Sequence, residues 1–191
     1  MPQQKSKKIL LYFFLFLSIA TLNNKNFINS NFSNLKLNFE DHQLHVNQIT
    51  EGFTEVTDIV IKTVFMFSTQ QLHELPSPTE AERLSVLAVG GYGREEMAPF
   101  SDVDLLFLTP YKVTPWAESA IESMLYILWD LKLRIGHATR SITDCLLMGK
   151  KDFTIRTTLL ETRLISGDEN LVSELDDRLW NELFQSSTSF W

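Results

Sequence analysis

The sequence predicts an α/β domain, and three observations lead to that prediction. Two short apolar stretches, 84–91 and 102–109, are typical of buried strands. A third strand is expected at 134–141. Amphipathic patterns with apolar residues three and four positions apart separate and follow these strands, so helices are expected between and after them.

The segment before the first strand predicts a helix and a capped turn. Apolar residues recur at helical spacing after Glu55, which favours a helix that runs to about His73. Two prolines end this element, and Thr79 is expected to cap a helical turn that continues to Arg83. The apolar positions of the helix are Val56, Ile59, Val60, Val64 and Phe67.

The next helices follow from prolines, caps and an apolar stripe. A loop with at most one helical turn is expected at 92–101, between the first two strands. Pro115 precedes a long helix at 116–133, and Thr143 begins a short one after the third strand. The stripe of the long helix is Ile121, Met124, Leu125, Leu128 and Leu131.

Two more amphipathic helices are expected at 152–165 and 169–184. Gly167 and Asp168 lie between them. A glycine commonly follows the end of a helix and an aspartate commonly caps the start of one, so this pair is expected to separate the two helices.

The two ends of the chain differ from the domain expected at 51–185. Residues 1–50 form an extension in which three lysines precede an apolar run at 9–22, and the Asn-rich part after the run is expected to be poorly ordered. The lysines and the run resemble a signal peptide, but a transmembrane helix needs about 20 apolar residues. Export, membrane association and a plain extension therefore stay open. The tail at 186–191 is atypical.

Composition narrows the classes of partner. The net charge is −7 and no basic cluster is longer than Lys5–Lys8, which argues against a protein that binds duplex nucleic acid. The single cysteine, Cys145, cannot form an internal disulfide, so a reducing compartment is expected. A site that binds a nucleoside triphosphate through metal ions is compatible with this charge.

Two carboxylates stand on one face of the second strand. Because side chains two positions apart in a strand point to the same side, Asp102 and Asp104 project together while Val103 and Leu105 face the core. Two such carboxylates repel each other, and a divalent cation between them removes the repulsion. Mg²⁺ is the natural candidate, since it combines one or two carboxylates with water and substrate phosphates.

Glycines directly after the first strand supply a second half of the site. Gly90, Gly91 and Gly93 let backbone amides approach an anion without a Cβ in the way, and Arg94 and Ser101 add side-chain donors. The spacing fits neither a P-loop nor a dinucleotide-binding turn. Together, the glycines and the carboxylates predict metal-assisted phosphoryl or nucleotidyl transfer.

The stretch GGYGREEMAPFSDVDLLFL resembles the nucleotidyltransferase motif of the DNA polymerase β superfamily. Within that superfamily, the chain from about Leu84 to Leu183 is similar to the bifunctional uridylyltransferase/uridylyl-removing enzymes that modify the PII nitrogen-signalling protein. The stretches MLYILWDLKLRIGHATRSITDC and DFTIRTTLLETRLISGD carry the similarity beyond the motif. The resemblance implies a small mixed sheet flanked by helices.

The resemblance also implies an activity: Mg²⁺-dependent transfer of UMP from UTP to a tyrosine of PII, in the cytoplasm. Asp102 and Asp104 would bind Mg²⁺, and the three glycines would hold the triphosphate with support from Arg94 and Ser101. The hydrolase and regulatory domains of the family do not match any part of this chain, which therefore looks like an N-terminal fragment. An inert remnant that only binds nucleotide or PII, and a small nucleotidyltransferase with another acceptor, remain alternatives.

A third acid usually found on the next core strand of the superfamily is missing from RIGHATR. Asp152 is one candidate for that role, with the cap of a helix as the alternative. His137 is expected either to face the site or to be a hydrogen-bonded core residue. Arg140 and Arg156 are expected either to contact phosphate or to pair with surface acids.

Overall fold

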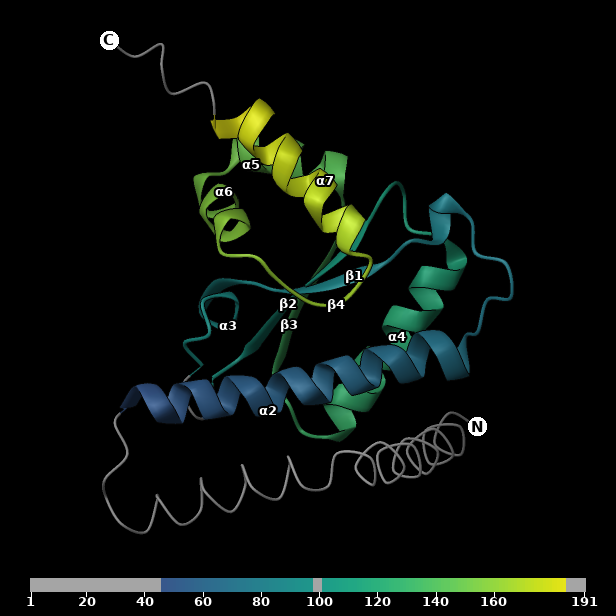
Figure 1. The fold of residues 1–191 in the computed structure, drawn as a ribbon, viewed down its shortest axis with the longest axis vertical. Coiled ribbons are helices and arrows are strands. Elements are labelled where there is room, and N and C mark those ends of the chain that lie inside the picture. Colours follow the sequence, from purple (N-terminus) through teal and green to yellow (C-terminus); the bar gives the residue numbers. More distant parts are fainter. Residues whose placement is uncertain (1–45, 98–100, 185–191) are drawn as a thin grey trace.

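A mixed sheet with the strand order β3-β2-β1-β4 lies at the centre of the fold (Figure 1). The structure is a computed structural model and describes residues 46–97 and 101–184. β1 is antiparallel to both β2 and β4, whereas β2 and β3 are parallel. The α/β class and the mixed sheet are therefore confirmed. The strands are β1 (Ser85–Ala88), β2 (Val103–Thr109), β3 (Ile135–Ser141) and β4 (Arg163–Gly167).

Helices cover both faces of this sheet. α2 and α4 pack on one face, while α5 and α7 pack on the other (Figure 1). α3 is a single turn at one end of the sheet, beside the first half of α2 (Figure 1). The helices are α2 (Val46–Phe67), α3 (Gly90–Gly93), α4 (Pro115–Asp130), α5 (Ile142–Lys151), α6 (Phe153–Leu160) and α7 (Glu169–Leu179), with shorter turns η1 (Ser68–Leu72), η2 (Glu80–Glu82) and η3 (Trp180–Phe184).

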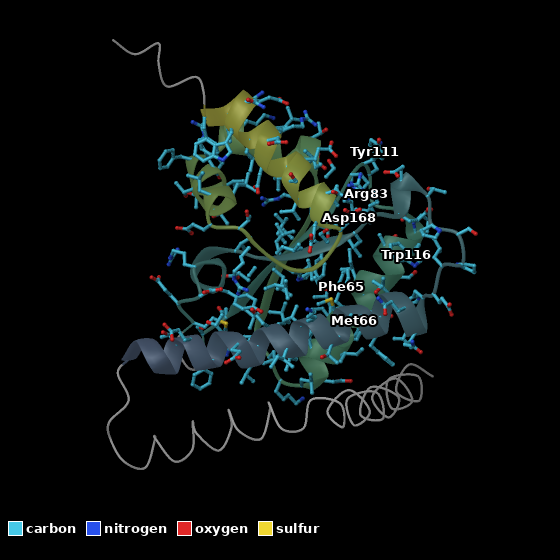
Figure 2. All side chains as sticks on the ribbon, viewed as in Figure 1. Phe65, Met66, Arg83, Tyr111, Trp116 and Asp168 are labelled. Carbon is cyan, nitrogen blue, oxygen red and sulfur yellow. The ribbon has the colours of Figure 1, made fainter. Side chains whose placement is uncertain are left out.

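The alternation of β2 divides the core into two layers. Val103, Leu105 and Phe107 join the layer under α2 and α4, whereas Leu106 and Leu108 join the layer under α5 and α7. Figure 2 labels Phe65 on α2, a buried side chain of the first layer. Burying each such large apolar side chain contributes about 2 kcal/mol to stability, so both faces of the sheet are tightly held.

The stripe predicted for the long helix is confirmed in α4. Ile121, Met124, Leu125 and Leu128 are buried, and Leu131 packs against the same cluster. The helix ends at Asp130, earlier than predicted. The N-terminal helix extends in the other direction: α2 begins at Val46 rather than near Glu55, so it crosses the boundary predicted between residues 50 and 51.

Two element predictions are wrong. Residues 163–165, expected to be helical, belong to β4, because the free edge of β1 needs a hydrogen-bonding partner and this short segment supplies it. Accordingly Gly167 ends a strand, not a helix; its positive φ of 123° lets the chain pass close to Leu84 and Ser85. The second wrong prediction is the extent of the first strand, which ends at Ala88 rather than at Gly91. The glycines that follow belong to α3.

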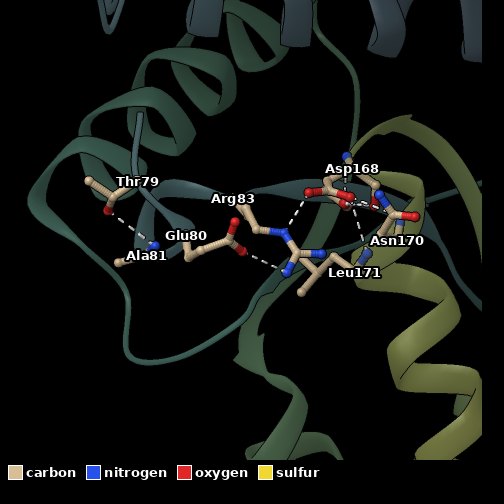
Figure 3. A network of polar contacts seen from close by, with 8 residues as sticks. Thr79, Glu80, Ala81, Arg83, Asp168, Asn170 and Leu171 are labelled. Carbon is tan, nitrogen blue, oxygen red and sulfur yellow. Dashed lines mark hydrogen bonds and ion pairs between the residues drawn. The ribbon is translucent and has the colours of Figure 1, made fainter. Parts of the chain in front are cut away.

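A polar network fastens the end of the sheet opposite α3 (Figure 3). Arg83 Nε donates to Asp168 Oδ2 at 2.5 Å, and Asp168 Oδ1 accepts from the backbone amides of Asn170 and Leu171 in the first turn of α7. The predicted caps at Thr79 and Asp168 are thereby confirmed. Figure 2 shows Arg83 and Asp168 close together beside β1. The network ties the chain before β1 to the chain after β4.

None of the helices formed by the described residues is long and apolar enough to cross a membrane. The apolar run at 9–22 and the tail at 186–191 lie outside the residues that the structure describes. The predictions made for them therefore stay predictions.

Candidate active site

Two exposed carboxylates stand at the start of β2, as the alternation of the strand predicts. Asp102 directly precedes the strand and Asp104 is its second residue, while Val103 and Leu105 between and after them are buried. Among the described residues, neither carboxylate has a hydrogen-bond or ion-pair partner. Partial burial, and next the charge of Asp102, raise the pKa of Asp104 above its usual value.

Two glycines from different elements border Asp104. A Cβ built on Gly90 would lie 3.8 Å from Asp104 Oδ2, and a Cβ built on Gly136 would overlap Oδ1. Gly136 pairs with Asp104 in the parallel ladder of β2 and β3. The carboxylate of Asp104 therefore occupies the space that a side chain on the neighbouring strand would fill.

The turn that carries the predicted phosphate-binding glycines is α3. Gly90 has a φ of +60°, a conformation that favours glycine, and it starts the turn directly after β1. The amides at the first turn of a helix have no acceptor within that turn, so Gly90 and Gly91 can present theirs to an anion. A Cβ on Gly91 would make only ordinary contacts, at 3.9 Å, so space remains above it.

Gly93 has a different role from the other two glycines. A Cβ at this position would overlap the backbone carbonyl of Glu161, in the chain that leads into β4. The close approach of two backbones therefore requires glycine here, independently of any ligand. The predicted contact of Gly93 with a triphosphate remains a prediction.

The two predicted side-chain donors differ in how firmly they are held. Arg94 donates from Nε to Glu96 at 2.9 Å, and its Nη1 lies 2.8 Å from a carboxylate oxygen of Glu161. These acids hold the guanidinium beside Gly91. Ser101 is exposed and directly precedes Asp102.

Among the described residues, none of the four weaker candidates forms a hydrogen bond or ion pair with Asp102 or Asp104. Asp152 caps α6, accepting from the amides of Thr154 and Ile155, which was its alternative role. Arg156 donates to the carbonyl of Gly149 at 2.9 Å and so links α6 to α5. Among the described residues, no group of three acid, histidine or cysteine side chains could hold a metal.

The other two weaker candidates lie on β3. His137 pairs with Leu105 and so lies on the face opposite Asp104; it is exposed, with its ring 6.3 Å from that of Trp129, and is not a core residue. Arg140 shares the face of Asp104 but is four residues beyond Gly136, about 13 Å along the strand.

Comparison with known proteins shows the family to which the chain belongs. Residues 31–139 match the family model for glutamate-ammonia ligase adenylyltransferase. The chain is 53% identical over 149 residues to a bifunctional uridylyltransferase/uridylyl-removing enzyme of Ruegeria pomeroyi, an alignment that covers 78% of this chain and 16% of that enzyme. The enzyme of the same name from Caulobacter vibrioides is 54% identical over 132 residues, or 69% of this chain and 14% of the relative.

A third relative of that name, from Rhodopseudomonas palustris, is 45% identical over 145 residues, which is 76% of this chain and 16% of the enzyme. The chain thus spans about one sixth of the length of the curated relatives it matches. The resemblance carried by the glycine and aspartate stretch is confirmed. The chain belongs to the glutamate-ammonia ligase adenylyltransferase family of nucleotidyltransferase domains and is homologous to a small part of the bifunctional uridylyltransferase/uridylyl-removing enzymes.

Proposed function

We propose that this domain binds UTP with Mg²⁺ and transfers UMP to a tyrosine hydroxyl of the PII signal protein in the cytoplasm. The observation that carries the proposal is the closeness of Gly90 to Asp104. A Cβ built on Gly90, the first residue of the glycine turn, would lie 3.8 Å from a carboxylate oxygen of Asp104. A phosphate on the turn and a cation on the acids would therefore be neighbours. The names of the relatives support UMP as the transferred group.

The acid pair fits a hard divalent cation. Asp102 and Asp104 offer carboxylate oxygens, the ligands that Mg²⁺ prefers, and the remaining positions are left to water and phosphate. The raised pKa of Asp104 reflects the cost of holding a partly buried negative charge beside a second one. When bound there, Mg²⁺ would neutralise phosphate oxygens and make the α-phosphorus a better electrophile.

The residues of the chain contribute binding and orientation. The backbone amides of Gly90 and Gly91 would donate hydrogen bonds to phosphate oxygens. Arg94, already held beside Gly91, would add a charged donor. In the transfer, the tyrosine oxygen bonds to the α-phosphorus, and the bond from that phosphorus to the bridging oxygen breaks. Pyrophosphate leaves with that electron pair, and the hydroxyl proton is released.

A second candidate, binding of nucleotide without turnover, is favoured by one observation. The position of β3 that pairs with Asp104 is Gly136, so this strand offers no third carboxylate beside the pair. A domain with two acids would still bind Mg-UTP. The two candidates therefore share a binding step and differ only in whether UMP is transferred.

The test is calorimetric titration of UTP into the full chain, with and without Mg²⁺. We expect Mg²⁺-dependent binding that falls at least about a hundredfold in Asp102→Asn, because one ligand oxygen becomes an amide of the same size. Asp177→Asn, an exposed aspartate on α7, is the matched control and should bind like the parent. Equal binding by Asp102→Asn and the parent would contradict the metal role.

A transfer assay with PII and labelled UTP then separates the two candidates. Labelling of PII that disappears in Asp102→Asn supports the transferase. Binding of Mg-UTP without any labelling by the parent favours the domain that only binds.

A further inference from the structure

A cluster of charged and aromatic groups lies behind the glycine turn. Tyr92 is the one residue of α3 with a side chain, and it is only 2% exposed. Its hydroxyl donates to Asp58 Oδ1, on α2, at 2.7 Å. Burial, and next the hydrogen bond to Asp58, raise the pKa of Tyr92, so the phenol stays a donor at any physiological pH.

Arg163, the first residue of β4, closes this cluster. Its Nη1 donates to Asp58 Oδ2 at 2.6 Å and its Nη2 to Asp58 Oδ1 at 3.0 Å, a bidentate pair. Nη2 also donates to the backbone carbonyl of Tyr92 at 3.3 Å, and the guanidinium carbon lies 5.5 Å from the centre of the tyrosine ring. Nε lies 3.3 Å from a carboxylate oxygen of Glu95, although it is not aligned for a hydrogen bond.

This single arginine contacts the turn and its exit at three points: the carbonyl of Tyr92, the ring of Tyr92 and the carboxylate of Glu95. Glu95 has a φ of 64°, an uncommon conformation for a residue with a side chain. A strained residue persists where its surroundings hold it, and Arg163 is one such restraint.

Arg163 lies on the opposite side of the sheet from the carboxylate of Asp104. It pairs with Ala88, which pairs with Leu105, and paired residues share a face. Leu105 faces the core layer under α2, whereas Asp104 faces away from it. Arg163 therefore cannot contact a ligand on Asp104 and can act only through the turn.

We propose that Arg163, clamped by Asp58, is a positioning residue that fixes the conformation of the glycine turn for the phosphates of the substrate. The proposal rests on the proposed function for what the turn receives. It also gives a role to the stretch LLETRLISGD. Glu161 in this stretch pairs with Arg94, which follows the turn, and Arg163 donates to the carbonyl of Tyr92 in the turn.

The chain contains a matched control for this pair. Arg83 and Asp168 form a second bridge between an arginine and an aspartate, with side chains 22% and 26% exposed, against 23% and 29% for Arg163 and Asp58. That bridge lies at the other end of β1 and does not contact the turn. Arg163→Gln and Arg83→Gln thus remove the same groups at similar burial.

Hydrogen exchange reads the turn directly, without any ligand. The amides of residues 93–96 donate to carbonyls of residues 89–92 at 2.9–3.2 Å, so their protection reports whether the turn is held. In the full chain, Arg163→Gln should speed exchange of these amides at least about tenfold beyond any change shared by the whole domain. Arg83→Gln should leave the turn protected, and Tyr92→Phe, which removes one hydroxyl, should have a smaller effect of the same kind.

Titration of Mg-UTP into the same variants completes the test. We expect about tenfold weaker binding by Arg163→Gln, partial recovery in Arg163→Lys, and parental binding by Arg83→Gln. Unchanged exchange at 93–96 in Arg163→Gln, or an equal loss of UTP affinity in Arg83→Gln, would overturn the proposal. If Arg163→Gln fails to fold, Tyr92→Phe and Arg163→Lys decide in the same way. Absence of Mg-UTP binding by the parent overturns the proposed function instead, while the exchange result still decides whether Arg163 holds the turn.

Discussion

The two ends of β1 treat their acids in opposite ways. Next to the first residue of β1, Asp168 accepts hydrogen bonds from Arg83 and from two backbone amides of α7. The hydrogen bond from Arg83 lowers the pKa of Asp168. Beside the last residue of β1, Asp104 has no partner of opposite charge among the described residues, and its pKa is raised. Two acids that lie at opposite ends of the same short strand therefore have opposite effects on the stability of the folded state.

The contrast separates what the fold needs from what a ligand would supply. A satisfied acid such as Asp168 stabilises the folded protein, whereas an unsatisfied one such as Asp104 costs free energy unless a cation arrives. Two arginines near the glycine turn do not neutralise Asp104: Arg94 is paired with Glu96 and Glu161, and Arg163 with Asp58. Both guanidinium groups are thus held by acids other than Asp102 and Asp104.

Among the substitutions that test this comparison, the largest effect is expected from one that adds a methyl group beside Asp104. In Gly136→Ala the new Cβ would overlap Asp104 Oδ1, so the carboxylate must move. Changing a residue that positions a metal ligand typically costs 10- to 100-fold in metal affinity, so we expect Mg²⁺-dependent UTP binding to weaken about a hundredfold, or about 2.7 kcal/mol. Calorimetric titration measures it.

A second glycine-to-alanine change provides the control. In Gly149→Ala the added Cβ meets the flexible ends of Leu183 and Leu159, in the core layer under α5 and α7. It should alter stability and leave UTP affinity within about twofold of the parent. If Gly136→Ala bound Mg-UTP as tightly as the parent, the position of Asp104 would not matter to binding.

At the end of β1 where Asp168 is hydrogen-bonded, the expected effect of a substitution is on stability alone. Asp168→Ala removes both the helix cap and the bond to Arg83 and should cost about 2 kcal/mol in urea unfolding, while Asp168→Asn keeps a cap and should cost about 1 kcal/mol. Because the folded pKa of Asp168 is lowered, its contribution is present above its ordinary pKa and is lost as the pH falls through the folded value. Both variants should therefore differ least from the parent in strong acid.

Neither Asp168 variant should change the affinity for Mg-UTP. A loss of affinity in both, in proportion to the loss of stability, would mean that the two ends of β1 are not separate in the way their contacts indicate.

Local patterns in the sequence were enough for one half of the site. The alternation around Asp102 and Asp104 placed both acids on one side of the strand, because period-two geometry needs no knowledge of the rest of the fold. The caps at Thr79 and Asp168 and the stripe of α4 were equally local. Each is determined by residues within a few positions of one another.

The remainder depends on pairing between distant segments. The sequence predicts the end of a helix where the structure has β4, because five residues among helix-forming neighbours carry little signal and the partner strand β1 lies more than 70 residues earlier. Gly136 had a local sign, since a glycine inside a strand often marks a close approach. Only the register between β2 and β3 shows that the group close to Gly136 is the carboxylate of Asp104. Asp58 and Arg163 are 105 residues apart, and no spacing relates them.

The smallest expected effect is a dependence of stability on pH that comes from Asp104. It is small because Asp104 is exposed and solvent screens its charge. Without Mg²⁺, the folded state holds the proton of Asp104 more tightly than the unfolded chain does. Between the ordinary aspartate pKa and the raised folded value, stability therefore falls as the pH rises. Asp104→Asn removes this dependence and should be slightly more stable than the parent at neutral pH.

Mg²⁺ should reverse that order, because a cation on the carboxylate replaces the proton and stabilises the parent but not the variant. The measurement is the difference in Tm between parent and Asp104→Asn from pH 4 to 8, with and without Mg²⁺. The difference isolates Asp104 from the other acids, which titrate in both proteins. A parent more stable than the variant at neutral pH without Mg²⁺ would mean that Asp104 has a cationic partner in the fold, and the contrast between the two ends of β1 would fail.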